Sequence, residues 1–148
     1  MIRIEMKSLD VAQLTAALGA GDARAGAVAA FVGRVRGDDG LTALTLEHYP
    51  GLAEKALAAI EAEARKRWPV LDLTLIHRVG RMEVGEAIVF VGATAAHRRD
   101  AIEAAHYMMD QVKVRGPFWK QEHRPGGDRW VEARAADDAA ALRWRPQE

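Results

Sequence analysis

The chain has 148 residues, of which 49% are hydrophobic and 28% charged, so it is long enough for one globular domain with a sizeable core. Its formal net charge is zero at pH 7; without an overall field, any anion has to be bound by a local cluster of basic residues. The absence of cysteine excludes disulfides, thiolate metal sites and a cysteine nucleophile or persulfide carrier on this chain.

The first residues, MIRIEMKSLD, alternate apolar and polar side chains, a pattern that predicts a half-buried strand. They lack the apolar segment of a signal peptide, and no run in the chain approaches the roughly 18 apolar residues of a membrane helix. We therefore expect a cytoplasmic protein. A short helix is predicted over Asp10–Leu18, with Ser8 or Asp10 as its N-cap and Gly19 as its end.

A mostly buried strand is predicted over Ala25–Arg36, and it ends in two arginines separated by one residue. In a strand, Arg34 and Arg36 point to the same face, where they form a cationic pair beside the flexible turn at Gly37–Gly40. An exposed polar strand end explains the same residues, so both interpretations stay open. The turn also suits a hairpin with the next predicted strand, Leu41–Tyr49.

The longest predicted helix begins at Pro50-Gly51 and runs to about Trp68, and its outer face carries an ordinary solvated charge pattern. Two more strands are predicted over Leu71–Val79 and Ala87–Ala93, with a turn around residues 83–86 between them. The second of these strands is apolar on both faces, which is typical of a central strand.

Histidines occur in two different settings in the middle of the chain. His77 lies in a predicted strand with no second histidine at metal-ligand spacing, so we interpret it as a packing residue and expect no metal site. Thr94 is a plausible N-cap, which puts His97, Arg98 and Arg99 in a first helical turn, where the dipole favours acidic side chains. Either these residues and the free N–H groups form an anion site, or the arginines simply point outward.

The segment that follows is the most informative part of the chain. Its helix is predicted to end at Gly116-Pro117, because proline lacks the N–H donor and disfavours helical geometry in the residue before it. A hairpin is predicted next, with arms at Phe118–Arg124 and Arg129–Ala133 around a turn at residues 125–128. The tail, Asp137–Glu148, is predicted to form a short helix, with Trp144 docked on the body or on a partner.

Two lysines bracket this helix end, Lys113 in the last turn and Lys120 in the following strand. A chain that reverses direction between them can aim both side chains at one pocket. The helix dipole alone also favours a lysine at a helix C-terminus, and a strand lysine is often a solvated edge residue.

Five stretches, taken together and in order, resemble the large, catalytic subunit of molybdopterin synthase. They cover about residues 26–133 and lie at Gly26–Gly37, Leu44–Leu57, Ile76–Arg98, Val112–Glu122 and Gly127–Ala133. The resemblance implies an α+β chain with an α/β hammerhead-like fold: a mixed or antiparallel sheet with packed helices plus a small β subdomain. Residues 1–148 are then a single domain, in which residues 110–134 carry the active-site lysines.

The same resemblance implies a sulfurtransferase of molybdenum cofactor biosynthesis that uses no cofactor. Its large subunit pairs with itself at the centre of a heterotetramer, and a small ubiquitin-like subunit at each end inserts a thiocarboxylated Gly-Gly tail. Sulfur passes from that tail to cyclic pyranopterin monophosphate, which becomes the dithiolene molybdopterin. A chain without cysteine fits this chemistry, because it has to receive its sulfur from another molecule.

By resemblance, Lys113 and Lys120 match the two functional lysines of the family. We expect Lys113 to carry the essential acid/base or intermediate-stabilising role and Lys120 to orient the thiocarboxylate or the substrate. Some substrate contacts are expected to cross the dimer; the matching residues are Arg34, Val35, Arg36, His97, Arg98, Lys113, Lys120, Gln121 and Glu122.

Three departures from the family pattern affect the expected contacts. The loop at Gly37–Gly40 is short, Gly116 replaces a usual alanine, and Gln121 stands where a basic residue is common. A non-catalytic module that binds a ubiquitin-like tail or a phosphorylated ligand through the same basic cluster is the alternative function. A single-stranded nucleic-acid binder is disfavoured by the neutral net charge.

Overall fold

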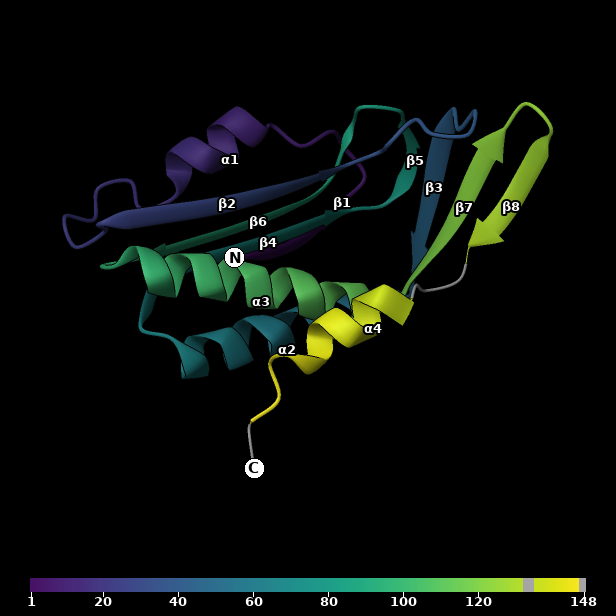
Figure 1. The fold of residues 1–148 in the computed structure, drawn as a ribbon. Coiled ribbons are helices and arrows are strands. Elements are labelled where there is room, and N and C mark those ends of the chain that lie inside the picture. Colours follow the sequence, from purple (N-terminus) through teal and green to yellow (C-terminus); the bar gives the residue numbers. More distant parts are fainter. Residues whose placement is uncertain (132–134, 147–148) are drawn as a thin grey trace.

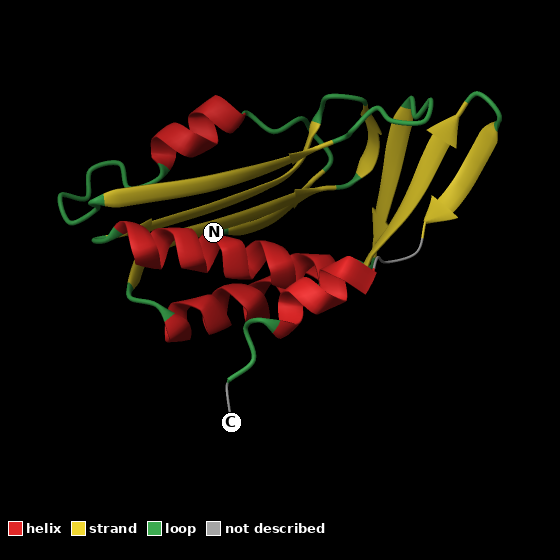
Figure 2. Cartoon of the chain, viewed as in Figure 1, coloured by secondary structure: helices red, strands yellow, loops and turns green. Residues whose placement is uncertain are grey.

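The computed structural model describes residues 1–131 and 135–146. These residues form two four-stranded sheets and four helices, and the second sheet stands beside one end of the first (Figures 1 and 2). The elements in chain order are β1 (Ile2–Glu5), α1 (Val11–Ala17), β2 (Ala27–Arg34), β3 (Ala43–His48), α2 (Leu52–Arg67), β4 (Val70–Arg78), β5 (Gly80–Glu83), β6 (Ala87–Ala95), α3 (Arg98–Arg115), β7 (Phe118–Arg124), β8 (Gly127–Val131) and α4 (Ala135–Leu142).

The first sheet has the strand order β1-β4-β6-β2, in which β6 pairs antiparallel with both β4 and β2 and β1 pairs parallel with β4. The prediction that the apolar stretch within β6 is central is therefore confirmed. Helices α2 and α3 cover one face of this sheet and α1 lies on the other (Figure 1). The main core forms under α2 and α3 from fully buried side chains, each of which stabilises the fold by roughly 1.5–3 kcal/mol; they include Leu57, Ile60, Leu73, Leu75, Val91 and Met108.

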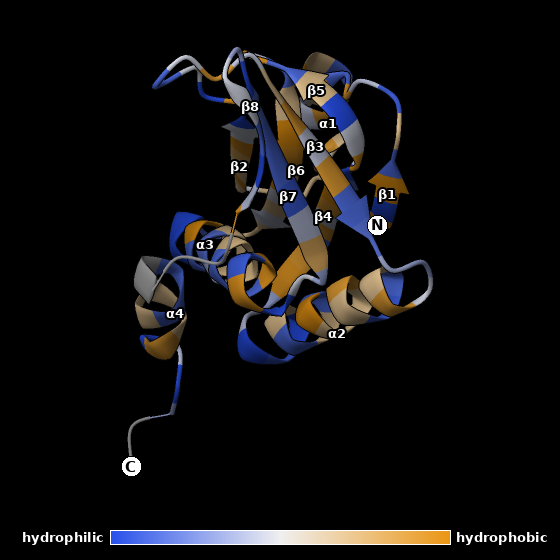
Figure 3. Ribbon diagram, turned by 90° about the vertical axis from the view of Figure 1, so that its right-hand side faces the viewer, coloured by the Kyte–Doolittle hydropathy of each residue, from blue (hydrophilic) through white to orange (hydrophobic). Residues whose placement is uncertain are grey.

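The second sheet has the strand order β5-β3-β7-β8 and is the small β subdomain that the sequence predicted. Its inner face packs on the end of the first sheet through a separate apolar cluster, to which β3, β5, β7 and the residue after β2 contribute. Figure 3 views this sheet in front of the first one. The cluster consists of Val35, Leu44, Leu46 and Met82, with Phe118 packed against it.

Local sequence accounts for the beginnings of two helices. Asp10 caps α1 as predicted, because its carboxylate accepts the N–H of Gln13 at 3.0 Å. At the start of α2, Gly51 adopts φ +83°, a left-handed conformation that glycine adopts without a steric cost. The Gly51 N–H donates to the Glu54 carboxylate at 2.6 Å, which closes the first turn.

One pairing prediction and two boundary predictions are wrong. Strands β2 and β3 do not form a hairpin across Gly37–Gly40, because β2 pairs with β6 in the first sheet and β3 pairs with β5 and β7 in the second. The sequence predicts a connection between Val79 and Ala87, but Gly80–Glu83 form strand β5 on the edge of the second sheet, where it pairs with β3. Thr94 is not an N-cap: it lies buried in β6 between Val28 of β2 and Asp72 of β4, because ladder partners on both sides extend that strand to Ala95. His97 takes the N-cap position instead, and α3 begins at Arg98.

The end of helix α3 and the hairpin after it form where the sequence predicts them, but the turn is shorter than predicted, because β8 begins at Gly127 and not at Arg129. Helix α3 ends at Arg115, and the hairpin of β7 and β8 follows; the last predicted hairpin residues, 132–134, lie outside the described part. Trp144 docks on the body as expected, because its indole N–H donates to Asp110 at 2.7 Å and its rings pack edge-on against Trp68 and Tyr107. Among the described residues no helix is both long enough and apolar enough to cross a membrane.

Candidate active site

The break between α3 and β7 brings a helix end against the second sheet. Gly116 closes α3, and its N–H donates to the carbonyl of Val112 at 3.0 Å. The backbone passes so close here that a Cβ on Gly116 would lie 2.7 Å from the Val112 oxygen and 2.8 Å from the Phe118 ring. The turn is therefore tight, and it separates exposed Lys113 from Lys120 by only seven positions in the sequence.

The pairing register decides which β7 side chains face inward. Phe118, Lys120 and Glu122 lie opposite His48, Leu46 and Leu44 of β3 in turn. Because Leu44 and Leu46 belong to the buried cluster, these alternate positions of β7 share the inner face of the second sheet. Lys120 is thus partly buried at the junction of the two sheets, and it is not a solvated edge residue.

A buried histidine lies beneath the two lysines. His77 is only 7% exposed, and its ring stacks on Phe118 with the centroids 4.0 Å apart and the planes at 18°. Its Nδ1 lies 3.0 Å from the carbonyl of Arg78; since a carbonyl only accepts hydrogen bonds, Nδ1 carries the proton and Nε2 keeps its lone pair. His77 is therefore a neutral ring in one defined tautomer.

The pKa of His77 is changed by its burial and by the charges around it. Burial lowers its pKa from 6.5 to about 4, opposed by the hydrogen bond to the Arg78 carbonyl and reinforced by the charges of Lys113, His48 and Lys120. Both predicted lysines thus act on the same buried ring from α3 and from β7. That both lysines serve one site stays a prediction, which this shared effect on His77 supports.

Sequence reasoning gave no role to His48 and only a packing role to His77. His48 ends β3, directly opposite Phe118, and its Nε2 lies 3.9 Å from the Glu54 carboxylate. No sequence signal separates either residue from an ordinary strand histidine, because the strand pairing and the stacking on Phe118 join segments far apart in the chain.

The predicted arginine pair lies at the end of β2, where the chain crosses to the second sheet. Val35 is buried in the apolar cluster of that sheet, and its backbone is held by Glu86 and Gly85 at 2.9 and 2.8 Å. Arg34 and Arg36 are exposed on either side of it, and Arg36 pairs with Asp38 at 2.8 Å. The structure thus keeps both cations at the junction, with Arg36 turned toward the short loop.

The remaining β7 residues fall on opposite faces. Glu122 is on the inner face with Lys120, where it forms an ion pair with Arg124 and lies 3.8 Å from Arg129. These two arginines also line a pocket of about 720 Å³ at the tip of the hairpin. Gln121 lies on the outer face, opposite Thr45 on one side and exposed Trp130 on the other.

One predicted pair is not brought to the lysines within a single chain. His97 and Arg98 are exposed at the beginning of α3, and Lys113 is in its last turn. Fifteen residues at the helical rise separate Arg98 from Lys113, a distance of about 22 Å. If His97 and Arg98 contact the same substrate as the lysines, a second copy of the chain has to supply them.

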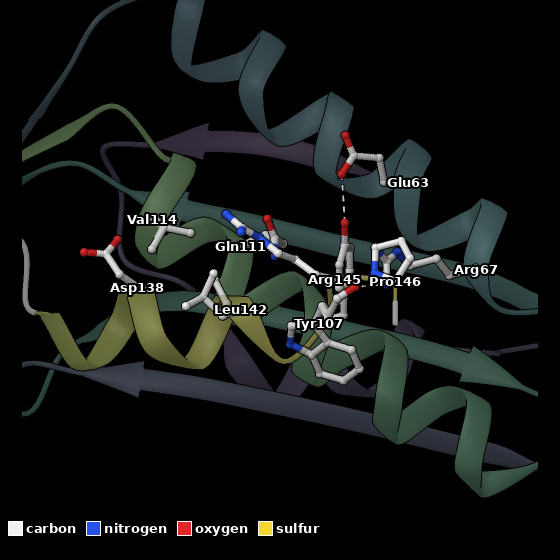
Figure 4. Close-up of a pocket in the computed structure, with 11 residues that line it drawn as sticks. Glu63, Arg67, Tyr107, Gln111, Val114, Asp138, Leu142, Arg145 and Pro146 are labelled. Atoms are coloured by element: carbon white, nitrogen blue, oxygen red, sulfur yellow. Dashed lines mark hydrogen bonds between the residues drawn. The ribbon is translucent and has the colours of Figure 1, made fainter. Parts of the chain in front are cut away.

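A second pocket, of about 400 Å³, lies between α2, α3 and α4 (Figure 4). On its wall the hydroxyl of Tyr107 donates to Glu63 at 2.8 Å, and Arg115 pairs with the same carboxylate. The hydrogen bond from Arg115 is the main cause that lowers the pKa of Glu63. None of the predicted site residues lines this pocket, so it is a structural junction beside the C-terminal helix.

Fold and site together define a class of protein: a two-sheet α+β enzyme subunit with paired lysines at the sheet junction and no sulfur nucleophile of its own. The sequence model of the family described as MoaE protein matches residues 4–115. The molybdopterin synthase catalytic subunit of Escherichia coli is 57% identical over 122 residues, which cover 80% of this chain and 81% of that protein. The chain belongs to the MoaE family.

Two further comparisons extend over nearly the whole chain. The molybdopterin synthase catalytic subunit of Pseudomonas aeruginosa is 51% identical over 146 residues, 97% of each protein. The solved structure of the molybdopterin biosynthesis MoaE protein from Burkholderia ambifaria superposes with a TM-score of 0.84, at 49% identity and with 97% of each chain covered. The predicted fold class is confirmed by these likenesses together with the two sheets described above.

Proposed function

We propose that this chain is the catalytic subunit of a cytoplasmic molybdopterin synthase. It transfers sulfur from the thiocarboxylated C-terminus of a small ubiquitin-like subunit to cyclic pyranopterin monophosphate, forming the dithiolene of molybdopterin. The observation that carries this proposal is that the charges of Lys113 and Lys120 both act on buried His77, in a chain whose relatives are molybdopterin synthase catalytic subunits.

The sulfur has to come from a partner. Without cysteine, this chain forms no persulfide, so its role is to bind the donor tail and the acceptor and to stabilise the charges that develop between them. A tail that ends in Gly-Gly is narrow enough to reach a site at the junction of two sheets. The small subunit is therefore part of the functional enzyme, and the large subunit by itself is inactive.

The two lysines take different parts in the proposal. Lys113 acts in proton transfer or stabilises the anionic intermediate, since an ammonium at a helix end is placed to meet developing negative charge. Lys120, partly buried and flanked by β3 and β8, orients the thiocarboxylate or the substrate. Glu122, on the same inner face, and the backbone around Gln121 complete this side of the site.

The phosphate of the substrate requires cations of its own. Arg34 and Arg36 lie at the sheet junction on either side of Val35, and guanidinium groups bind phosphate through paired hydrogen bonds. His97 and Arg98 join the site from the second large subunit of a homodimer, which reconciles their distance from Lys113 with a shared substrate. Two small subunits then complete a heterotetramer.

The test combines the protein with a thiocarboxylated ubiquitin-like partner and cyclic pyranopterin monophosphate, and measures the oxidised fluorescent derivative of molybdopterin. We expect product with the wild-type protein and none with Lys113→Ala. Lys66→Ala is the matched control, because Lys66 is an exposed lysine in the last turn of α2 and lies outside the site. Partner binding without product in the wild type would favour the non-catalytic binding module.

A further inference from the structure

Sulfur transfer at Lys113 and Lys120 requires proton transfers, and these need a group that both accepts and releases protons near neutral pH. We call the surroundings of these two lysines the lysine centre. A lysine ammonium donates a proton and then has to regain one before the next transfer. Glu122 is held in ion pairs with Arg124 and Arg129, and the neutral ring of His77 is buried, with Nδ1 committed to the Arg78 carbonyl. These inward groups therefore leave the exchange of protons with solvent to another residue.

His48 is placed for that exchange. It pairs with Phe118 across β3 and β7, and Lys120 is the next inward position of β7, so His48 and Lys120 are diagonal neighbours on one face. Diagonal neighbours in an antiparallel pair lie roughly 7–8 Å apart, a gap that one water or a bound substrate group spans. The charge of His48 also acts on His77, as do the charges of both lysines.

His48 is open to water on one side and lies near a carboxylate on the other. Its side chain is 21% exposed, so water reaches it, whereas His77 behind it is closed off. The Glu54 carboxylate lies 3.9 Å from Nε2 and accepts a hydrogen bond from the Gly51 N–H. The charged or titratable groups near His48 are Glu54 of α2, at 3.9 Å, and Lys120 of β7 on the same face. His77 of β4 is the ring on which the charges of His48, Lys113 of α3 and Lys120 all act.

Resting on the function proposed above, we propose that His48 exchanges protons between the lysine centre and solvent during sulfur transfer. When a group at the centre releases a proton, the neutral ring accepts it and becomes an imidazolium beside Glu54, and the proton then passes to water. When the centre needs a proton, the imidazolium donates one and the ring is recharged from solvent. An imidazole ring serves as either acid or base in general acid–base catalysis, which is the property this exchange requires.

The test uses the assembled enzyme with its small subunit and compares His48→Ala with the wild type in single-turnover sulfur transfer. We expect the rate to fall about 100-fold, the lower end of what a positioned acid–base group contributes. Free imidazole should restore a large part of the lost rate, whereas the apparent affinity for substrate should stay unchanged. His106→Ala is the control, because His106 is an exposed histidine of α3 that pairs with Asp110 outside the site.

A second measurement does not depend on activity. If His48 faces His77 as described, His48→Gln should raise the His77 pKa above its value of about 4, as followed by NMR of the ring. Full activity in His48→Ala, or a loss that imidazole does not restore, overturns the inference and leaves the proposed function intact. A wild-type enzyme that forms no product overturns the proposed function, and the role of His48 falls with it.

Discussion

The ring of Phe118 lies flat on the ring of His77, with centroids 4.0 Å apart and planes 18° from parallel. This contact joins the first residue of β7 to a buried residue of β4, and so connects the strand that carries Lys120 to the first sheet. The charges of both lysines act on the His77 ring of this stacked pair. A change in the charge or the position of His77 is therefore expected to alter the electrostatic surroundings of Lys113 and Lys120.

The first prediction concerns the pH dependence of stability. The His77 ring binds a proton in the unfolded chain below about 6.5 but in the folded protein only below about 4. Between these values the unfolded chain binds more protons, so the free energy of unfolding falls as the pH is lowered, by about 2 kcal/mol between pH 7 and pH 5. Urea unfolding at both pH values measures this difference.

His77→Phe provides the comparison for that experiment, because phenylalanine keeps an aromatic ring against Phe118 and cannot titrate. The difference between pH 7 and pH 5 should shrink in this variant. The carboxyl groups of Glu63 and Glu86, whose pKa values the fold lowers below 4.5, lose their contributions only at lower pH. Equal pH dependence in the two proteins would show that His77 is not the group responsible.

The second prediction concerns Gly116, at the end of α3. A Cβ at this position meets the Val112 carbonyl at 2.7 Å and the Phe118 ring at 2.8 Å, so Gly116→Ala has to displace the start of β7. We expect a loss of about 1–3 kcal/mol in the free energy of unfolding, the usual cost of overpacking. Gly126→Ala is the control, since nothing lies within 4 Å of its Cβ. Similar stability of the two variants would contradict the close approach.

The third prediction concerns the carboxylate that ties α2 to the end of α3. Glu63 accepts from the Tyr107 hydroxyl and pairs with Arg115, two positions after Lys113. Because the Glu63 side chain is 42% exposed, solvent screening limits the expected loss in Glu63→Gln to about 1 kcal/mol. This contribution is present above pH 4.5 and is lost as the pH falls through the lowered pKa of Glu63.

Tyr107 supplies an independent measurement of the same contact. Burial raises its pKa above 10.0, and the hydrogen bond and negative charge of Glu63 raise it further. Ultraviolet titration should therefore show an earlier phenolate transition in Glu63→Gln than in the wild type. Glu61→Gln, which removes a pair with Arg65 on the same helix, should leave this transition in place.

The fourth prediction tests whether one site uses two copies of the chain. Lys113→Ala and Arg98→Ala should each be inactive as separate homodimers in the sulfur-transfer assay. After the two variants are mixed, dissociated and reassembled, half of the dimers are hybrids with one intact site each, so about a quarter of the wild-type activity should return. No recovery in hybrids that have been verified by mass spectrometry would place Arg98 outside the shared site.

The order of helices and strands was largely available from the sequence. Periodicity, proline and glycine predicted where α1, α2 and α3 end. The segment of β6 that is apolar on both faces indicated a central strand. Local signals were less reliable where ladder partners decide an assignment. Thr94 has the side chain of an N-cap, yet pairing with β2 and β4 keeps it in a strand. The short strand β5 forms because it pairs with the edge of β3.

The candidate site divides in the same way. The sequence by itself determined that Lys113 and Lys120 flank a chain reversal, that arginines end β2, and that no cysteine carries sulfur. Only the tertiary structure decided that His77 and His48 share the lysine centre, that Gln121 faces outward, and that one chain keeps Arg98 about 22 Å from Lys113. The physical reason is that turns and helix ends are set by neighbouring residues, whereas strand register and ring stacking join segments that are distant in sequence.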